Sequence, residues 1–196
     1  MSSRKRGTQP GRLPAAEPGR HRVSGVRYLA VVFAFLSLGA CTSIPEGIHP
    51  VDGFELNRYL GTWYEIARLD HSFERGLERV SAHYSLRGDG GVNVVNKGYS
   101  ASENRWKQAE GKAYFVRESN EGYLKVSFFG PFYGSYVIFE LDKNSYSYAF
   151  VTGYDKSFLW LLARTPTVDD SLMEKFIGDA RRLGFAVEAL IMVQQP

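Results

Sequence analysis

The sequence predicts an all-β fold with one C-terminal helix, in which eight antiparallel strands form an up-and-down β-barrel. Short runs rich in Tyr, Phe and Val alternate with turn-forming residues over most of the chain, which is the pattern of consecutive short strands. After Thr167 the apolar residues change to helical spacing. Short strands joined by hairpins favour a closed barrel, and a sandwich of two sheets is the alternative with the same number of strands.

Turn-forming residues separate the eight strands. Arg87–Gly91 contains three glycines and an aspartate, which tolerate positive φ and therefore favour a hairpin turn. Glu118–Gly122 is a second turn of this kind. The expected strands are Trp63–Leu69, Val80–Leu86, Val92–Tyr99, Lys107–Val116, Tyr123–Phe128, Ser135–Leu141, Tyr146–Thr152 and Phe158–Thr165.

The C-terminal part of the chain predicts an amphipathic helix. Thr167 can cap the free amides at its start, and Asp169 and Asp170 suit the positive end of the helix dipole. Gly184 can end the helix, and Leu190–Val193 follows as a short strand. We expect the apolar face to pack on the outside of the barrel; it consists of Leu172, Met173, Phe176, Ile177, Ala180 and Leu183.

The first 40 residues have the order of a signal peptide of lipoprotein type. Basic residues precede an apolar run of 11 residues, Tyr28–Leu38, which is shorter than the roughly 20 residues that cross a bilayer. Small residues then lead to Cys41, the only cysteine in the chain. We expect cleavage before Cys41 and a diacylglycerol on its thiol, which would anchor the chain in a membrane. A buried structural cysteine is the alternative.

The residues after the cleavage site divide into a short linker and one domain. Residues 41–52 are expected to be the lipidated N-terminus and an extended linker, because two prolines and a glycine interrupt regular structure there. Such a linker would hold residues 53–196, the barrel domain, away from the membrane surface. Thr42 follows the cysteine where an aspartate would indicate retention in the inner membrane, so the outer membrane is favoured.

The net positive charge of the chain comes from the predicted signal peptide, residues 1–40. Residues 1–40 hold seven Lys or Arg and one acid, so the remainder carries 17 bases and 20 acids, a net charge of −3. The basic balance of the whole chain is therefore no indication of nucleic-acid binding. Without a second cysteine the domain has no internal disulfide, and its stability must come from packing.

Three segments carry a resemblance to a known family. Gly61-Thr62-Trp63-Tyr64 opens the first strand, Arg164 lies at the end of the eighth, and Asp142 retains part of a third motif between strands six and seven. On these segments the chain resembles the lipocalins, members of the calycin group of barrels. The resemblance implies that Trp63 and Arg164 form a pair at the closed end of the barrel. A guanidinium can stack on an indole there and donate to nearby carbonyls.

From about residue 51 onward the chain is most similar to the bacterial outer-membrane lipoprotein lipocalins, relatives of apolipoprotein D. The similarity is marked over Arg58–Asp70, Phe73–Glu78 and Leu124–Gly134. It implies a barrel that binds fatty acids or lysophospholipids and stores or transports lipid for the cell envelope, often under stress. It also implies a lipid-anchored protein of the cell outer membrane, with its domain in the periplasm.

The resemblance also implies which side chains face the interior of the barrel. Inward and outward residues alternate along each strand, and the inward set is mostly apolar and aromatic, which suits an acyl chain. Tyr84, Asn96 and Tyr136 could bind a polar head group. A filled core without a cavity is the alternative. The predicted cavity residues are Tyr84, Val94, Asn96, Val126, Phe128, Tyr136, Ile138, Val151, Phe158 and Trp160.

The loops at the open end include an unusual group of aromatic residues. Phe129, Phe132 and Tyr133 are expected in an exposed loop between strands five and six, and Phe73 lies in the loop after strand one. Apolar side chains in an exposed loop predict a partner. The candidates are the bilayer, an entering lipid or a second copy in a homodimer; a loop folded over the mouth is the alternative.

The residues also argue against several other functions. The enzymatic lipocalins need a cysteine nucleophile inside the barrel, and the domain after Cys41 has none. No ligand spacing indicates a metal, and no motif indicates another cofactor or nucleic acid. His71 lies near Asp70 and Glu74, where we expect solvated loop charges. A lipid binder remains as the main prediction, and an envelope scaffold that uses the barrel without a lipid is the alternative.

Overall fold

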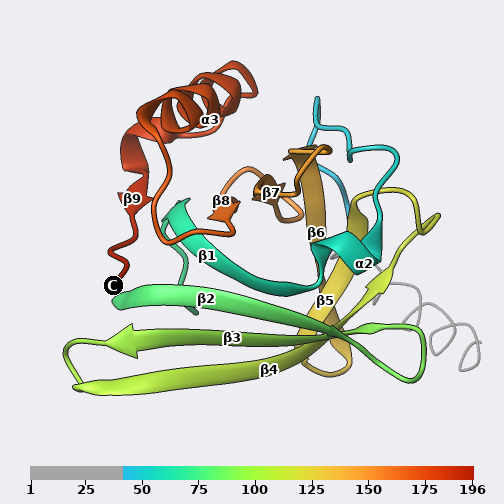
Figure 1. Ribbon diagram of the computed structural model, residues 1–196, viewed down its shortest axis with the longest axis horizontal. Coiled ribbons are helices and arrows are strands. Elements are labelled where there is room, and N and C mark those ends of the chain that lie inside the picture. Colours follow the sequence, from blue (N-terminus) through green and yellow to red (C-terminus); the bar gives the residue numbers. More distant parts are fainter. Residues whose placement is uncertain (1–41) are drawn as a thin grey trace, which may run out of the picture. The chain divides into compact units, whose positions relative to one another are not determined.

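The computed structural model describes residues 42–196, which contain nine strands and two α-helices (Figure 1). The predicted signal peptide and Cys41 lie outside the described residues. Most of the predicted strands are found within a few residues of their expected bounds. The strands of the barrel are β1 (Gly61–Arg68), β2 (Leu77–Leu86), β3 (Val92–Ser100), β4 (Arg105–Phe115), β5 (Tyr123–Phe129), β6 (Phe132–Leu141), β7 (Tyr148–Thr152) and β8 (Leu159–Ala163).

The strands form a closed barrel, which decides against the sandwich. Each strand from β2 to β8 pairs with the next, all antiparallel. β1 closes the sheet because it pairs with β2 over residues 61–64 and with β8 over residues 64–68. The backbone groups of both edges are therefore satisfied within the sheet. The prediction of an eight-stranded up-and-down barrel is confirmed.

The barrel seam between β1 and β2 is completed by the C-terminal segment. Beyond residue 64, β1 leaves β2 and pairs instead with β9 (Ile191–Met192). The Val193 amide donates to the Ile66 carbonyl at 2.9 Å. The side-chain amide of Gln195 donates to the carbonyls of Glu65 at 2.6 Å and Val80 at 3.0 Å. The predicted short strand after the helix is thus a structural part of the barrel wall.

The predicted helix is α3 (Asp170–Arg182), which lies on the outside of the barrel near β7 and β8 (Figure 1). Its Phe176 is fully buried and meets the Phe150 ring edge-on, with centroids 4.9 Å apart. A short 3-10 helix, η1 (Val187–Ala189), connects α3 to β9. Within residues 42–196 no helix is both long and apolar enough to cross a bilayer.

The cap of α3 differs from the sequence prediction. Asp169, not Thr167, is the N-cap residue, and its carboxylate accepts a hydrogen bond from the Leu172 amide at 2.8 Å. The Thr167 carbonyl instead accepts from the Thr165 hydroxyl at 2.7 Å. The sequence offers acceptor side chains at both positions, and Asp169 is the one whose carboxylate meets a backbone amide of the first helical turn.

Residues 42–51 are not an extended linker, which corrects the sequence prediction. We call this segment the N-terminal strap. Ile48 is only 4% exposed and belongs to the core between the barrel and α3. Val51 exchanges backbone hydrogen bonds with Ile138 and Gly122 at 2.9 and 2.8 Å. Pro and Gly interrupt regular structure here, as expected, but the apolar side chains between them still find a surface to pack on.

Candidate functional site

The closed end of the barrel is built around the pair that the resemblance implied. The Arg164 guanidinium carbon lies 3.9 Å from the centre of the Trp63 ring system. Its nitrogens donate to the carbonyls of Thr62 at 2.9 Å and Arg58 at 2.7 Å. Trp63 is fully buried, and its indole N–H donates to the Tyr59 carbonyl at 2.7 Å. These contacts close this end of the barrel to solvent.

A short helix, α2 (Leu56–Tyr59), lies across the same end. Tyr59 packs on Trp63 with ring centroids 4.6 Å apart, and Phe54 packs on Tyr59 at 5.2 Å. Together with Tyr146 these aromatic side chains form the inner core of the closed end. The open volume of the barrel therefore lies toward the opposite end, where β1 joins β2 and β7 joins β8.

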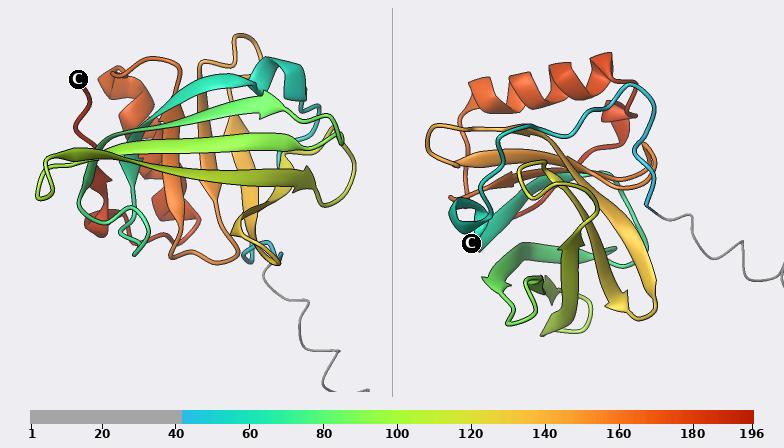
Figure 2. Two further views of the ribbon diagram at one scale, coloured as in Figure 1. Left: turned by 90° about the horizontal axis from the view of Figure 1, so that it is seen from below. Right: turned by 90° about the vertical axis from the view of Figure 1, so that its right-hand side faces the viewer.

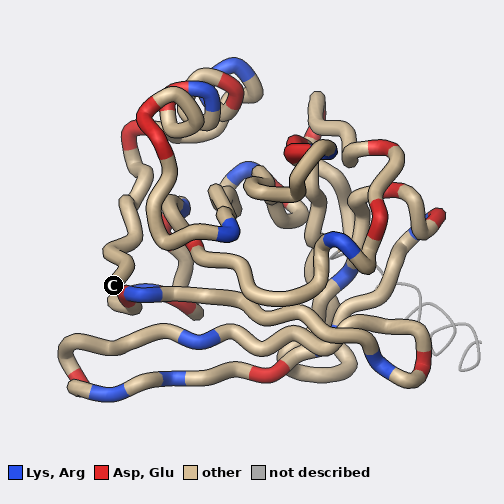
Figure 3. The backbone as a smooth tube through the Cα atoms, in the orientation of Figure 1, with Lys and Arg blue, Asp and Glu red and all other residues tan. Residues whose placement is uncertain are grey.

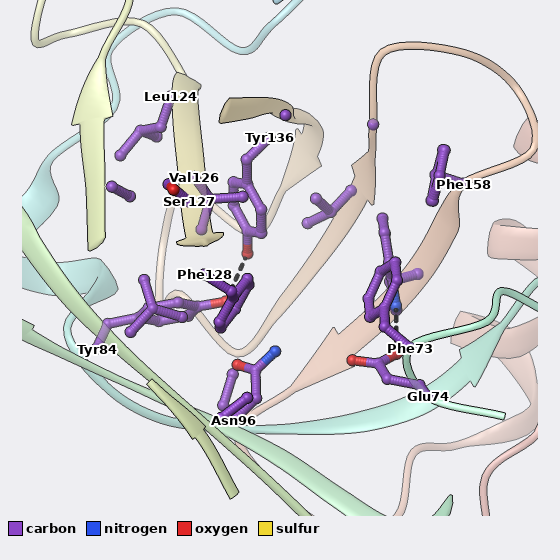
Figure 4. Close-up of a pocket in the computed structure, with 18 of the residues that line it drawn as sticks. Phe73, Glu74, Tyr84, Asn96, Leu124, Val126, Ser127, Phe128, Tyr136 and Phe158 are labelled. Atoms are coloured by element: carbon purple, nitrogen blue, oxygen red, sulfur yellow. Dashed lines mark hydrogen bonds between the residues drawn. The ribbon is translucent and has the colours of Figure 1, made fainter. Parts of the chain in front are cut away.

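The barrel encloses a cavity of about 730 Å³ that opens at that opposite end. This volume lies within the range of pockets that hold small organic ligands. The wall is predominantly apolar, and Figure 4 shows several of its side chains converging on the cavity from different strands. The structure places nine of the predicted cavity residues on this wall: Tyr84, Val94, Asn96, Val126, Phe128, Tyr136, Val151, Phe158 and Trp160.

Ile138 is the one predicted cavity residue that does not line the cavity. Its side chain is fully buried in the core of the closed end. It lies opposite Val151 on β7, and its Cβ is close to Gly122. The strand phase predicted the inward direction, but inward residues near the closed end are covered by the aromatic core and the strap, so no cavity surface remains at this level.

Three tyrosine hydroxyls form the deepest polar group of the wall. The Tyr136 hydroxyl lies 2.8 Å from that of Tyr59 and 2.9 Å from that of Tyr84. Figure 4 shows the contact between Tyr136 and Tyr84. Burial raises the pKa of all three phenols well above its usual value, so each hydroxyl is neutral at neutral pH. Two hydrogen bonds within the trio use two of its three hydrogens, which leaves one O–H that can donate to a ligand oxygen.

Asn96 and Ser127 add two further polar atoms to the wall. The Asn96 Oδ1 and Ser127 Oγ atoms are buried, line the cavity and have no hydrogen-bond partner among residues 42–196. A buried polar atom without a partner is costly, so both atoms favour a ligand, or water, that supplies one. Figure 4 shows Asn96 and Ser127 on different sides of the cavity, which suits a polar group held between apolar walls.

A buried charged cluster lies where the cavity meets the β1–β2 loop, and sequence reasoning missed it. Arg68 is 1% exposed and donates to Glu65 Oε1 at 2.7 Å. His71 Nε2 lies 3.1 Å from Glu74 Oε2, which also accepts from the Trp160 indole at 3.2 Å. His71 and Glu74 are therefore buried, not solvated as the sequence suggested, because Phe73 stacks on the imidazole and Trp160 packs against it at a tilt.

The two carboxyl groups of this cluster have different proton affinities. Burial, and then the nearby Glu74 carboxylate, raise the pKa of Glu65 well above its usual value. Burial would also raise the pKa of Glu74, but hydrogen bonds from His71 and Trp160 outweigh it and lower that pKa. Both carboxyl groups line the cavity. The alternation of side chains from Trp63 was the signal that could have placed Glu65 inside.

The open end carries the aromatic residues that the sequence singled out. Phe129 is 82% exposed, Phe132 is 69% exposed and Phe73 is 57% exposed, and all three border the cavity. The expected β5–β6 loop is shorter than predicted, since Phe129 ends β5, Phe132 begins β6 and the two residues pair with each other. Tyr133 is half-buried on β6, where Lys125 lies over its ring.

Comparison with known proteins identifies the family. The Lipocalin-like domain model matches residues 54–195. The chain belongs to the lipocalin family. It is 57% identical over 170 residues to the outer membrane lipoprotein Blc of Vibrio cholerae serotype O1, covering 87% of this chain and 99% of that one. Mouse apolipoprotein D is 33% identical over 136 residues, covering 66% of this chain and 68% of its own.

Solved lipocalin structures agree with the fold. The cockroach allergen Per a 4 superposes with a TM-score of 0.61 at 21% identity, covering 79% of this chain and 96% of the allergen. The lipocalins are a family of binding and transport proteins, and as a member this chain binds a lipid or another small hydrophobic molecule. Its relatives also confirm the prediction of an outer-membrane lipoprotein.

Proposed function

We propose that this lipocalin binds a fatty acid or lysophospholipid and stores or carries it for maintenance of the cell envelope, including under stress. The observation that supports this most directly is the apolar cavity of about 730 Å³ with one open end. An acyl chain would lie between Val94, Val126 and Phe128. The Tyr59–Tyr136–Tyr84 hydroxyls and Asn96 provide hydrogen bonds for a polar head group.

The proposal includes a membrane anchor at Cys41. The relatives are outer-membrane lipoproteins, and Cys41 follows Leu38-Gly39-Ala40 at the end of the apolar leader segment, where a diacylglycerol would be attached. The domain would then face the periplasm. The chain has no second cysteine, so the thiol chemistry of the enzymatic lipocalins is not part of this proposal, and neither metal nor cofactor takes part in it.

Lipid extraction from the purified full-length protein tests the ligand. Co-purifying fatty acid or lysophospholipid, displaced by a fluorescent fatty acid, is the expected result. Affinity should rise with acyl length by about 0.8 kcal/mol per buried methylene, which is roughly fourfold per carbon, until the cavity is full. A protein that never takes up lipid would instead favour an envelope scaffold that uses the barrel without a ligand.

A cavity-filling variant tests the location of the ligand. Val126 lines the cavity from β5, whereas its neighbour Lys125 points outward over the Tyr133 ring. Val126→Trp should weaken binding of the fluorescent fatty acid at least about tenfold, since an indole occupies the space of several methylenes. Lys125→Trp is the matched control and should bind as the unchanged protein does. Equal affinities in the two variants would place the ligand elsewhere.

A further inference from the structure

The open end of the barrel has an apolar rim with no covering segment among the described residues. We define the aromatic rim as Phe73, Phe129 and Phe132, whose side chains are more than half exposed. No charged residue lies between Lys125 and Glu140, so the part of the β5–β6 hairpin around its tip is tan in Figure 3. A loop folded over its own mouth would bury these rings. Their exposure therefore indicates that the rim meets a partner.

The N-terminal strap runs toward the same end of the barrel. It leaves the closed end at Val51, which is hydrogen-bonded to Ile138 and Gly122, and continues along the outside of β5 and β6. Its first residues are held by side chains of the barrel. The Tyr123 hydroxyl donates to the Thr42 carbonyl, and the Ser135 hydroxyl donates to the Ser43 carbonyl at 2.6 Å.

Contacts of Ser43 place the start of the strap beside the mouth. The Ser43 hydroxyl donates to the Tyr154 carbonyl at 3.1 Å. Tyr154 and Ser135, which are hydrogen-bonded to Ser43, both line the cavity that opens there. In both views of Figure 2 the start of the described chain lies beside the orange β7–β8 connection. The strap and the aromatic rim therefore belong to one end of the barrel.

Because the strap is packed on the barrel, it cannot act as a long flexible tether between the barrel and the lipid anchor. Ten extended residues could span about 35 Å, whereas one peptide bond joins neighbouring Cα atoms only about 3.8 Å apart. Ser43 is held beside the mouth by the Tyr154 carbonyl, and Cys41 lies only two residues before it. A lipid on Cys41 would consequently hold the mouth at the membrane surface, with no slack through which the barrel could turn away.

We propose that the aromatic rim inserts into the bilayer that holds the Cys41 lipid, so that the cavity opens directly onto the membrane. This inference rests on the proposed acylation of Cys41. A second copy of the chain is the competing occupant of an apolar rim. The bilayer is favoured because the strap delivers the anchor to this same end, and phenylalanine side chains gain free energy when they leave water for the interfacial region.

Site-specific labelling of the full lipidated protein tests the orientation. Acylation blocks the Cys41 thiol, so Phe132→Cys provides a single free thiol at the rim for an environment-sensitive NBD fluorophore. Leu86→Cys is the matched control, because Leu86 is 55% exposed and lies at the end of β2 that is farther from the aromatic rim. Each labelled protein is reconstituted in vesicles of phosphatidylethanolamine and phosphatidylglycerol, with and without lipids that carry a nitroxide on the acyl chain.

The expected result is several-fold stronger nitroxide quenching at position 132 than at position 86, together with a blue-shifted emission. Strong quenching of both labels by aqueous iodide would show that the rim faces water and would overturn the proposal. Protection of position 132 from both quenchers would also overturn it, because the rim would then be buried between two copies. The mass of the purified protein reports acylation separately, and uptake of a fluorescent fatty acid reports the proposed lipid binding.

A spacer variant tests the contribution of the strap. Ten Gly and Ser residues inserted between Cys41 and Thr42 leave the strap contacts and the rim unchanged but restore a long tether of flexible chain. Nitroxide quenching at position 132 should fall clearly. Unchanged quenching would overturn the role given to the short connection, because the aromatic rim by itself would then be enough to orient the barrel on the membrane.

Discussion

Arg164 combines three kinds of contact at the closed end of the barrel. Its guanidinium stacks on Trp63 and donates to the carbonyls of Thr62, Arg58 and Tyr146. The planar fork of arginine can make these contacts at once, whereas the single ammonium of lysine cannot. The residue thus ties β1, α2 and the β6–β7 turn to the end of β8, although these segments are far apart in sequence.

Substitution of this residue should destabilise the barrel without changing its charge. We expect Arg164→Lys to lower the free energy of unfolding by about 2 kcal/mol, since the stacked contact and at least one charged hydrogen bond are lost. Urea unfolding followed by tryptophan fluorescence measures this. Arg182→Lys on the exposed side of α3 is the control and should have little effect. Equal stability of the two variants would contradict the role given to Arg164.

Glu65 predicts a pH dependence of stability. An acid whose folded pKa is raised, as burial and Glu74 raise that of Glu65, binds its proton more tightly in the folded state. Its favourable contribution is complete below the unfolded pKa of about 4.3 and is lost as the pH rises toward the folded pKa. Glutamine does not titrate, so wild type should lose stability relative to Glu65→Gln between pH 4.5 and 7.5.

Urea titrations of both proteins at three pH values within this window give the difference in free energy of unfolding. Glu118→Gln, in the exposed β4–β5 turn, is the matched control, and its difference from wild type should stay constant with pH. A difference for Glu65→Gln that grew in favour of wild type as the pH rises would show that the Glu65 carboxylate, not its protonated form, is the one stabilised in the fold.

At the scale of single elements, the N-cap of α3 can be assigned to Asp169 by experiment, in place of Thr167 two positions earlier. Asp169 accepts from the Leu172 amide, whereas the Thr167 side chain has no such contact with the helix. Asp169→Ala should therefore lower the Tm by roughly 2–4 °C, as loss of an N-cap does in a domain of this size. Thr167→Ala should leave the Tm nearly unchanged. Calorimetry measures the Tm of both variants. A larger decrease for Thr167→Ala than for Asp169→Ala would identify Thr167 as the N-cap, as the sequence predicted.

Most elements could be predicted because local patterns determine them. Hairpin turns such as Arg87–Gly91 and the helical period of α3 are visible within a few residues. The course of the strap was not, because Ile48 looks like any apolar residue in a Pro- and Gly-containing segment until the surface that covers it is known. The start of β7 was also placed too early. The strand begins at Tyr148 and not at Tyr146, because the positive φ of 55° at Tyr146 interrupts the extended backbone.

On the scale of the whole molecule, the strap contributes to the stability of the barrel. Ile48 is buried between the barrel and α3, so Ile48→Ala should lower the free energy of unfolding by about 3 kcal/mol, the cost of a cavity in a packed core. The exposed Glu46 lies in the same segment, and Glu46→Ala should cost very little. Denaturant unfolding compares the two, and equal values would mean that the strap is detached in solution.

The candidate site shows the same division between local and distant information. The inward positions of Val126, Phe128 and Tyr136 followed from alternation within single strands, with the phase taken from the resemblance to the lipocalins. The Glu65–Arg68–His71–Glu74 cluster did not, because its burial depends on Trp160, which is 86 residues away from Glu74 in sequence. Ile138 was placed on the correct side of its strand but at the wrong depth, since depth depends on where the aromatic core of the closed end stops.

The seam between β1 and β2 has a consequence for how the chain is made. Residues 191–195 satisfy backbone groups of Glu65, Ile66 and Val80 that neither strand can satisfy with the other. During synthesis β1 and β2 emerge more than 100 residues before this segment. Until then their open ends are unpaired strand edges, which invite association with other chains. Closure of the wall therefore has to wait for a segment that is made long after β1 and β2, and folding has to keep those edges apart until it arrives.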